Sequence, residues 1–206
     1  MRPGPLGGAC KRLMDIAGAV CGIVVLSPVI LAVAVAVRIS MGSPVLFRQS
    51  RAGRHGRPFT LYKFRTMLLS QSEEIDPKTD AARLTRLGIF LRNSSLDELP
   101  QLWNVLKGEM SLVGPRPLLL EYLAYYTPRQ SKRHLMRPGI TGLAQIKGRN
   151  AVTWDQKFMW DVRYVERWNI FLDLRILVAT IAKVIKPEGI SRQGHATTEK
   201  FGAEPR

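Results

Sequence analysis

One apolar run near the N-terminus constrains this chain more than any other feature. Residues 16–37 carry no charged side chain, and about 20 consecutive apolar residues suffice for a helix to cross the hydrocarbon core of a bilayer. The run is longer than a usual signal-peptide core, and Ala32, Ala34 and Ala36 give only a vague cleavage site. The sequence therefore favours a membrane helix over a signal peptide.

The centre and the flanks of this run bear on how it meets the membrane. Ser27 and Pro28 lie at its centre, and proline inside a helix removes a backbone donor and produces a bend. Ser27 can bond a carbonyl that the bend frees. Basic residues precede the run (Lys11, Arg12) and follow it from Arg38 onwards, so the positive-inside rule favours the same side for both ends. A re-entrant helix that turns at Ser27 and Pro28 satisfies both flanks, and a kinked spanning helix remains the alternative.

The charge balance points to an anionic partner. Lysine and arginine number 31 against 16 acidic residues, which gives a net charge of +15. Nucleic acid, anionic lipids and phosphorylated substrates all suit such a chain, although a solvated basic surface is the simpler explanation. The sequence has no helix-turn-helix, zinc-finger or RNA-binding signature. Together with the membrane run, this favours anionic membrane lipids and phosphorylated substrates, with no nucleic acid.

The remaining chain predicts an α+β fold that is mostly helical with a small β-hairpin. Residues 43–49 and 59–65 alternate in polarity around a glycine-containing basic loop, as hairpin strands do. Helical patterns cover residues 83–91, 95–106, 118–126, 127–136, 152–168 and 171–185, whereas residues 70–81 form a loop and residues 114–117 and 137–142 form turns. Residues 152–185 mix aromatic, basic and apolar side chains, which suits an interfacial amphipathic helix or, equally, a core helix followed by a surface helix. We expect a membrane-embedded segment at 1–40 and a catalytic domain at 41–206.

Asp97 and Glu98 form the sharpest acidic pair in this basic chain. One interpretation is structural, because Ser95 followed by Glu98 has the spacing of a helix capping box, and acidic side chains favour a first turn. The chemical interpretation is that one carboxylate faces a substrate phosphorus while the other holds Mg²⁺.

Four basic residues could neutralise phosphate around this pair. Lys63 and Arg65 occupy alternate positions of a predicted strand, so they share a face and could grip one anion. Arg92 precedes Asp97 in a helical pattern, and Arg116 lies between two prolines that restrict its backbone. Arginine suits phosphate because its planar fork donates two parallel hydrogen bonds.

Five short motifs follow the apolar run in a fixed order. They are YKFRTM at 62–67, SLDELPQ at 95–101, NVLKG at 104–108, SLVGPRP at 111–117 and RPGITG at 137–142. Together they resemble the bacterial sugar transferases, the small monotopic phosphoglycosyl transferases, over residues 11–200. The segment GHATTEKF at 194–201 is similar to the tail of members that transfer N,N'-diacetylbacillosamine phosphate in glycoprotein pathways.

The resemblance implies a reaction and assigns roles to residues. A sugar-1-phosphate would move from a UDP-sugar to undecaprenyl phosphate at the cytoplasmic face of the inner membrane, releasing UMP, in glycoprotein or surface polysaccharide synthesis. Asp97 would be the nucleophile that forms an aspartyl-phosphosugar intermediate, Glu98 the Mg²⁺ ligand and Arg116 a phosphate-binding residue, with Lys63 and Arg92 in support. Ser27 and Pro28 would break a re-entrant helix. Further candidates for substrate contacts are Arg65, Arg137, Thr141, Gln145, Asn150 and Trp154.

Overall fold

The computed structural model describes residues 5–69, 83–148, 152–185 and 201, and within them the fold is α+β and mostly helical, as predicted. Helices α1, α3, α4, α5, α6, α7 and α8 span Pro5–Met41, Arg86–Ser94, Gln101–Lys107, Pro128–Ser131, Leu143–Gly148, Trp154–Arg167 and Ile170–Ile185. Strands β1 to β4 span Leu46–Ala52, Pro58–Phe64, Ser111–Val113 and Gly139–Thr141. Short 3₁₀ segments cover Arg54–Gly56, Leu96–Glu98 (η3), Leu120–Tyr125 (η4) and Lys132–Leu135.

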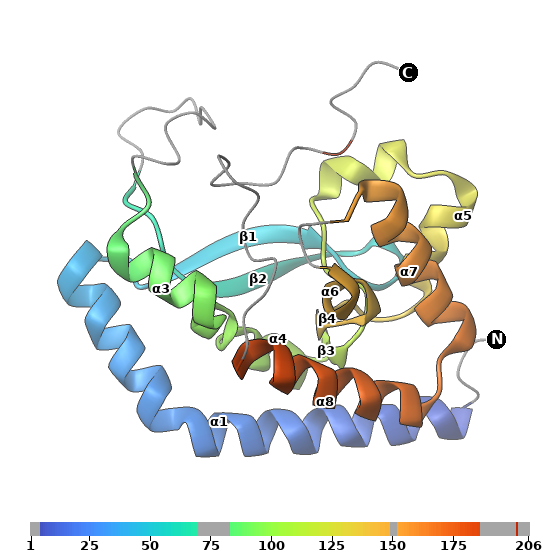
Figure 1. Cartoon of the computed structure of the whole chain (residues 1–206), viewed down its shortest axis with the longest axis horizontal. Coiled ribbons are helices and arrows are strands. Elements are labelled where there is room, and N and C mark those ends of the chain that lie inside the picture. Colours follow the sequence, from blue (N-terminus) through green and yellow to red (C-terminus); the bar gives the residue numbers. More distant parts are fainter. Residues whose placement is uncertain (1–4, 70–82, 149–151, 186–200, 202–206) are drawn as a thin grey trace.

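Helix α1 contains the apolar run and is bent rather than broken. It runs along the base of the molecule and then turns upward (Figure 1), with Pro28 inside a single helix. Pro28 has no N–H to donate to the carbonyl of Val24, and the Ser27 hydroxyl donates to that carbonyl instead, at 2.8 Å. The predicted hydrogen bond from Ser27 to a carbonyl that the bend frees is therefore confirmed, and helical structure continues past the proline.

Both ends of α1 are bonded to the rest of the molecule. Near its start, Lys11 donates to Asp173 at 2.6 Å, and Arg12 donates to the carbonyl of Val105 at 2.6 Å. Beyond its last turn, the Arg65 guanidinium donates to the carbonyls of Met41, Gly42 and Ser43. Residues from other parts of the chain therefore hold both ends of α1.

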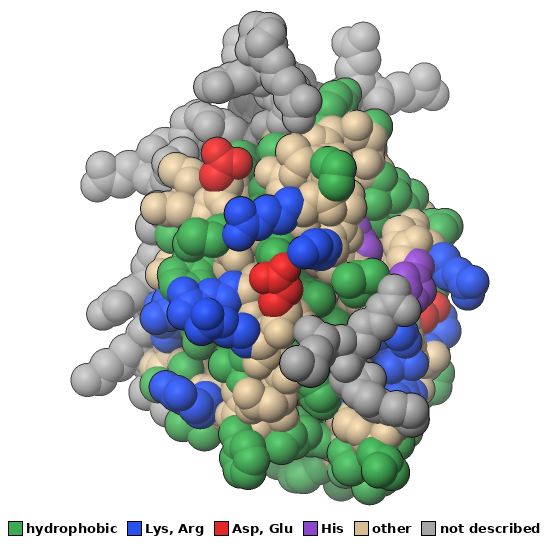
Figure 2. Space-filling view, turned by 90° about the vertical axis from the view of Figure 1, so that its right-hand side faces the viewer, with side chains coloured by type: hydrophobic (Ala, Val, Ile, Leu, Met, Phe, Trp, Pro, Cys, Tyr) green, Lys and Arg blue, Asp and Glu red, His purple; other side chains and the backbone are tan. Residues whose placement is uncertain are grey.

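The outward face of α1 is apolar and exposed. The helix is long and apolar enough to cross a membrane, and only 11% of its most apolar window is buried. Helix α8 lies beside α1 (Figure 1) and exposes Phe171, Leu174, Val178 and Ile181 at helical spacing. Figure 2 shows hydrophobic side chains along the lower edge of the molecule and charged side chains above it. An exposed apolar base of this kind indicates membrane association.

Strands β1 and β2 form the predicted hairpin, and two helices dock against it. The strands pair antiparallel with Phe47 opposite Lys63. Buried Asn104 of α4 accepts from the amide of Tyr62 at 3.2 Å and donates to the carbonyl of Thr60 at 2.7 Å. A Cβ on Gly88 of α3 would lie 1.9 Å from the carbonyl oxygen of Thr66, so only glycine allows this close approach. These contacts place the end of β2 beside the turn that follows α3.

A second, parallel pair joins β3, for which the sequence predicted no element, to β4, which lies in the turn predicted at 137–142. Ser111 pairs with Gly139 and Val113 with Thr141. A Cβ on Gly139 would lie 2.0 Å from the amide nitrogen of Gly114, which explains glycine at that position. The pair fixes the segment that runs from Val113 towards Arg116.

The predicted helices between α3 and α7 are shorter and more divided than expected. A single helix over 95–106 is replaced by η3 and α4, and the pattern at 118–126 forms η4. The helix predicted at 127–136 is divided into α5 and a 3₁₀ turn. The loop predicted at 70–81 lies outside the described residues.

Asp173 holds α1, α7 and α8 together, and we expect its loss to destabilise the protein. Fully buried Asp173 accepts from Lys11, from the Tyr164 hydroxyl at 2.7 Å and from the Trp168 indole at 3.0 Å. Asp173→Ala leaves the Lys11 ammonium buried without its counter-charge, which costs about 3–5 kcal/mol of unfolding free energy. Denaturant unfolding in detergent measures this loss.

The matched control is Glu166→Ala, which removes the exposed ion pair with Lys132. This control should leave the unfolding midpoint nearly unchanged, because an exposed pair is screened by solvent. A loss from Asp173→Ala no larger than that of the control contradicts the stabilising role.

Candidate active site

The turn that carries Asp97 and Glu98 is set by the backbone of Ser95. Ser95 has φ of 59°, its amide donates to the carbonyl of Arg92, and it thereby ends α3 and starts η3. In this left-handed conformation its side chain makes no capping hydrogen bond. The capping-box interpretation is therefore wrong, because the Glu98 side chain bonds to other groups instead of reaching back to Ser95.

An ion-pair cluster surrounds the two carboxylates. Lys63 Nζ lies 2.6 Å from Glu98 Oε1 and 3.7 Å from Asp97 Oδ2. Arg116 Nη2 lies 2.8 Å from the same Glu98 oxygen. The side chains of Asp97 and Glu98 are 10% and 15% exposed, whereas that of Arg116 is 47% exposed. The cluster thus joins a nearly buried acidic pair to a cation that solvent and solutes can reach.

Long-range contacts position the two cations. Lys63 lies at the end of β2, which α4 holds through Asn104. Arg133 donates to the backbone carbonyl of Arg116 at 2.6 Å and also to Asp161 at 2.8 Å. This buried Arg133–Asp161 pair fixes the backbone at Arg116. The guanidinium group of Arg116 is directed at Glu98.

The environment moves the pKa values of the two carboxyl groups apart. Burial raises the pKa of Asp97, and the positive charge of Lys63 opposes part of that rise. Burial alone would also raise the pKa of Glu98, but the charges and hydrogen bonds of Arg116 and Lys63 hold it well below its usual range. Glu98 is therefore ionised at neutral pH, and Asp97 is the more basic of the two carboxylates.

Two further arginines lie close to this cluster. Arg92 donates to the Thr66 hydroxyl at 3.0 Å, and its charge lowers the pKa of Asp97. Burial, and next the charge of Arg116, lower the pKa of Arg51 to about 10. The charges of Arg51 and Arg116 thus act on one another, and paired guanidinium groups suit a phosphate that carries two charges.

Arg51 is the residue that sequence reasoning missed. Its position at the end of β1 becomes informative only because the amide of Ala52 donates to the carbonyl of Leu118 at 3.0 Å, beside the segment of Arg116. This contact joins segments far apart in the sequence, and no local pattern signals it.

Four residues predicted to bind substrate are bonded elsewhere. Arg65 does not share an anion with Lys63, because β2 ends at Phe64 and Arg65 instead caps the end of α1. Arg137 donates to the carbonyl of Gly108, and the Thr141 hydroxyl bonds that of Thr180 at 2.7 Å. Gln145 donates to the carbonyl of Ile140 at 3.4 Å. The structure brings together Lys63, Arg92 and Arg116 with the acidic pair.

Trp154 and Asn150 were also predicted to contact the substrate, and the structure describes only Trp154. Trp154 packs edge-on against Tyr122, with ring centroids 5.7 Å apart, and lies 5.6 Å from the ring of Phe201. Asn150 lies outside the described residues, as does the C-terminal motif except for Phe201.

The residues present fit a magnesium ion that is shared with phosphate. Among the described residues no group of three or more histidine, cysteine, aspartate or glutamate side chains gathers, so they offer no closed protein cage. Mg²⁺ commonly binds through one or two carboxylates plus substrate phosphates and water. Lys63 and Arg116 both bond Oε1 of Glu98, which leaves Oε2 outside these two contacts. Glu98, with Asp97 beside it, is thus a suitable donor set.

Comparison with known proteins identifies the family. The model of the family described as "Bacterial sugar transferase" matches residues 6–187. The uncharacterized sugar transferase EpsL of Bacillus subtilis is 52% identical over 93% of this chain and 95% of its own length. The exopolysaccharide production protein ExoY of Rhizobium meliloti is 37% identical over 90% of this chain and 89% of its own length.

A relative with a named reaction is longer than this chain. The UDP-glucose:undecaprenyl-phosphate glucose-1-phosphate transferase of Xanthomonas campestris is 42% identical over 85% of this chain, but the match covers only 38% of that protein. The family match spans the helix, the acidic turn and the basic residues described above. The chain belongs to the bacterial sugar transferase family.

Proposed function

We propose that this protein is a phosphoglycosyl transferase, a phosphotransferase that moves a sugar-1-phosphate from a UDP-sugar to undecaprenyl phosphate. The products are undecaprenyl-diphospho-sugar and UMP. The observation that carries the proposal is buried Asp97 beside Glu98, flanked by Lys63 and by the accessible Arg116. Membership of the family, and a relative named for this reaction, support the substrate class.

In the first step, a carboxylate oxygen of Asp97 attacks the phosphorus that bears the sugar. An acyl-phosphate bond forms, and the bond from that phosphorus to the bridging oxygen breaks. The electron pair leaves with UMP. Lys63 holds Asp97 as a carboxylate, and the guanidinium groups of Arg116 and Arg51 balance the charge of the diphosphate.

In the second step, a phosphate oxygen of the lipid attacks the same phosphorus. The new diphosphate bond forms and the Asp97 carboxylate is released unchanged. A covalent intermediate lets one site handle a water-soluble donor and a lipid acceptor in turn. Magnesium bound at Glu98 would supply further neutralisation of phosphate charge. Phosphoryl transfer depends mostly on such positioning and charge balance.

A donor screen tests this function. Purified protein in detergent is incubated with undecaprenyl phosphate, Mg²⁺ and one of several UDP-sugars, and released UMP is measured. We expect release with at least one donor, dependent on the lipid phosphate. No release with any donor, together with tight binding to anionic vesicles or nucleic acid, would identify a basic binding module instead.

The pH dependence of donor turnover should report the Asp97 carboxylate. Burial raises the pKa of Asp97 and Lys63 lowers it, so removal of the lysine raises it further. Because the reacting form is the carboxylate, we expect Lys63→Met to lose activity at a higher pH than the wild type as the pH falls. The measurement is kcat/KM for the UDP-sugar against pH.

Lys107→Met is the matched control for this profile. Lys107 pairs with Glu109 and is not among the charges that shift the pKa of Asp97. The acid limb of the Lys107→Met pH profile should match that of the wild type. An acid limb of Lys63→Met that is unmoved, or moved to lower pH, would contradict the assignment.

We further propose a monotopic, re-entrant arrangement at the cytoplasmic face of the inner membrane. Bonds at both ends of α1 to one domain support it. In a background of Cys10→Ser and Cys21→Ser, single cysteines at exposed Leu6 and Leu69 should both be protected from an impermeant periplasmic reagent in intact cells. Labelling at position 6 alone would establish a spanning helix.

A further inference from the structure

Arg51 is a partly buried cation with an unsatisfied hydrogen-bond donor. Burial lowers its pKa to about 10, so it still carries its charge at neutral pH. Among the described residues its guanidinium makes one hydrogen bond, from Nη2 to Oε1 of Gln49, and its Nε is buried without a partner. A buried charge costs free energy unless an opposite charge or hydrogen bonds compensate it. The unsatisfied Nε therefore indicates that an anion completes this site.

The β1–β2 hairpin places Arg51 on the face that carries Lys63. Phe47 of β1 lies opposite Lys63, and Arg51 is four residues further along the same strand. Side chains at such positions point to one face, about 13 Å apart at roughly 3.3 Å per residue. Lys63 bonds Glu98 at its end of this face. The charged site thus extends from the acidic turn along the strand to Arg51.

The charge of Arg116 links Asp97 to Arg51. Arg116 bonds Glu98, the residue that follows Asp97. Burial has the largest effect on the pKa of both Asp97 and Arg51, and the charge of Arg116 acts on both as well. The charges with the largest effects on the pKa of Asp97 do not include that of Arg51. Arg51 therefore lies further from Asp97 than Arg116 does.

The proposed reaction sets the direction of the donor in this site. Asp97 attacks the phosphorus that bears the sugar, and in phosphoryl transfer the attacking and leaving oxygens lie roughly in line. The second phosphate of the donor, which leaves in UMP, therefore lies on the side of the reacting phosphorus that faces away from Asp97. Beyond Arg116 on the hairpin face, Arg51 provides the unsatisfied donor that such a phosphate needs.

We propose that Arg51 binds the phosphate that leaves with UMP, and that Gln49 is the positioning residue that holds its guanidinium. The inference rests on the proposed function. When the bond from the reacting phosphorus to the bridging oxygen breaks, the electron pair stays on that oxygen and adds negative charge to the UMP phosphate. Arg51 stabilises this charge through charge-assisted hydrogen bonds. The donor thus lies with its sugar phosphate at Asp97 and Arg116 and with its uridine phosphate at Arg51.

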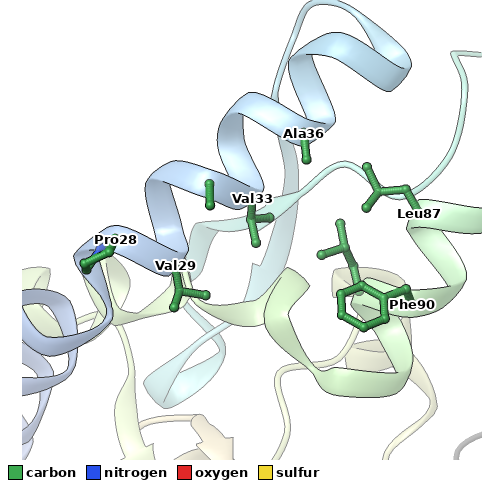
Figure 3. Close-up of a pocket in the computed structure, with 8 residues that line it drawn as sticks. Pro28, Val29, Val33, Ala36, Leu87 and Phe90 are labelled. Carbon is green, nitrogen blue, oxygen red and sulfur yellow. The ribbon is translucent and has the colours of Figure 1, made fainter.

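The apolar groove between α1 and α3 is not an alternative place for this phosphate. Side chains of the two helices, among them Val33 and Phe90, face one another across it (Figure 3), and its lining residues are all apolar. A phosphate there would lose its hydration without gaining hydrogen bonds. Of these two features, the hairpin face is the one that can bind the charged part of the donor.

Binding of UMP tests the inference without turnover. UMP is titrated by calorimetry into the purified protein in detergent with Mg²⁺, in the absence of donor and lipid. Arg51→Met should raise the Kd for UMP by roughly tenfold to a hundredfold, the loss expected for a hydrogen bond between charged groups. Arg48→Met is the matched control, because Arg48 is exposed on the opposite face of the same strand. It should keep the wild-type Kd.

A second pair of variants tests the role of Gln49. Gln49→Leu removes the acceptor of the Arg51 hydrogen bond and should raise the Kd for UMP by roughly threefold to tenfold. In the Arg51→Met background it should cause no further loss, because Gln49 acts through Arg51. Losses that add in the double variant would show that Gln49 acts independently of Arg51 and is not a positioning residue.

Gln49→Glu covers the case in which Arg51→Met does not fold. The added carboxylate pairs with Arg51 and competes with phosphate, so the Kd for UMP should rise by at least about tenfold. The inference is overturned if the wild type does not bind UMP, if Arg51→Met or Gln49→Glu binds it as the wild type does, or if Arg48→Met loses as much affinity as Arg51→Met. These outcomes differ from a failure of the proposed function, in which no UDP-sugar releases UMP from the wild type.

Discussion

Asp97→Asn should lower the rate of UMP release by roughly three to five orders of magnitude, as expected when a group that acts only in the chemical step is lost. The amide keeps the shape of the side chain but cannot form the acyl-phosphate. The measurement is kcat for UMP release with saturating donor and undecaprenyl phosphate. Asp155→Asn, at an exposed position in the first turn of α7, is the matched control and should retain the wild-type rate.

The same substitution should leave the fold intact. Burial raises the pKa of Asp97, so this group binds its proton more tightly in the folded state than in the unfolded chain. Its contribution to stability is then present at low pH and is lost as the pH rises through the folded pKa. The neutral amide avoids that loss, and we expect an unchanged or slightly higher unfolding midpoint at neutral pH. An inactive and unfolded Asp97→Asn protein would instead indicate a structural role.

Glu98→Gln is the second substitution with a large expected effect. It removes the negative charge that pairs with both Lys63 and Arg116. It also weakens the proposed binding of Mg²⁺ by this side chain. We expect a rate loss of roughly two to four orders of magnitude, together with a higher Mg²⁺ concentration for half-maximal activity. A magnesium titration of UMP release measures both quantities.

Glu166→Gln provides the comparison, because Glu166 also pairs with a lysine but at an exposed site. It should match the wild type in rate and in magnesium requirement. If Glu98→Gln retained the wild-type magnesium curve and the wild-type rate, Glu98 would be neither a metal ligand nor part of the reacting cluster.

The sequence correctly predicted the elements that depend on interactions between residues close together in the chain. The alternation of apolar and polar residues identified the β1–β2 hairpin, and Pro28 identified the bend in α1. The parallel β3–β4 pair was missed because each strand has only three residues and its partner lies far along the chain. The helix predicted from Ser95 onwards was wrong because Ser95 adopts a left-handed conformation, which propensity alone does not reveal.

The sequence predicted the kind of side chains that form the site, but not all of the residues that lie in it. The acidic pair and Arg116 stand out from their sequence context. Strand alternation placed Arg65 with Lys63, but the strand ends one residue earlier and the end of α1 provides carbonyl acceptors for Arg65. Arg51 enters the cluster only through a tertiary contact between β1 and Leu118. Such long-range contacts have no signature in the local sequence.

Detection of a sugar phosphate bound to Asp97 would show that this carboxylate attacks the donor. Wild-type protein is incubated with the active UDP-sugar and Mg²⁺ without lipid acceptor, then digested and analysed by mass spectrometry. We expect the peptide that contains Asp97 to gain the mass of the sugar phosphate. UMP should be released in equal amount, and undecaprenyl phosphate should remove the adduct. An adduct on another residue, or a fully active Asp97→Asn protein, would contradict this role of Asp97.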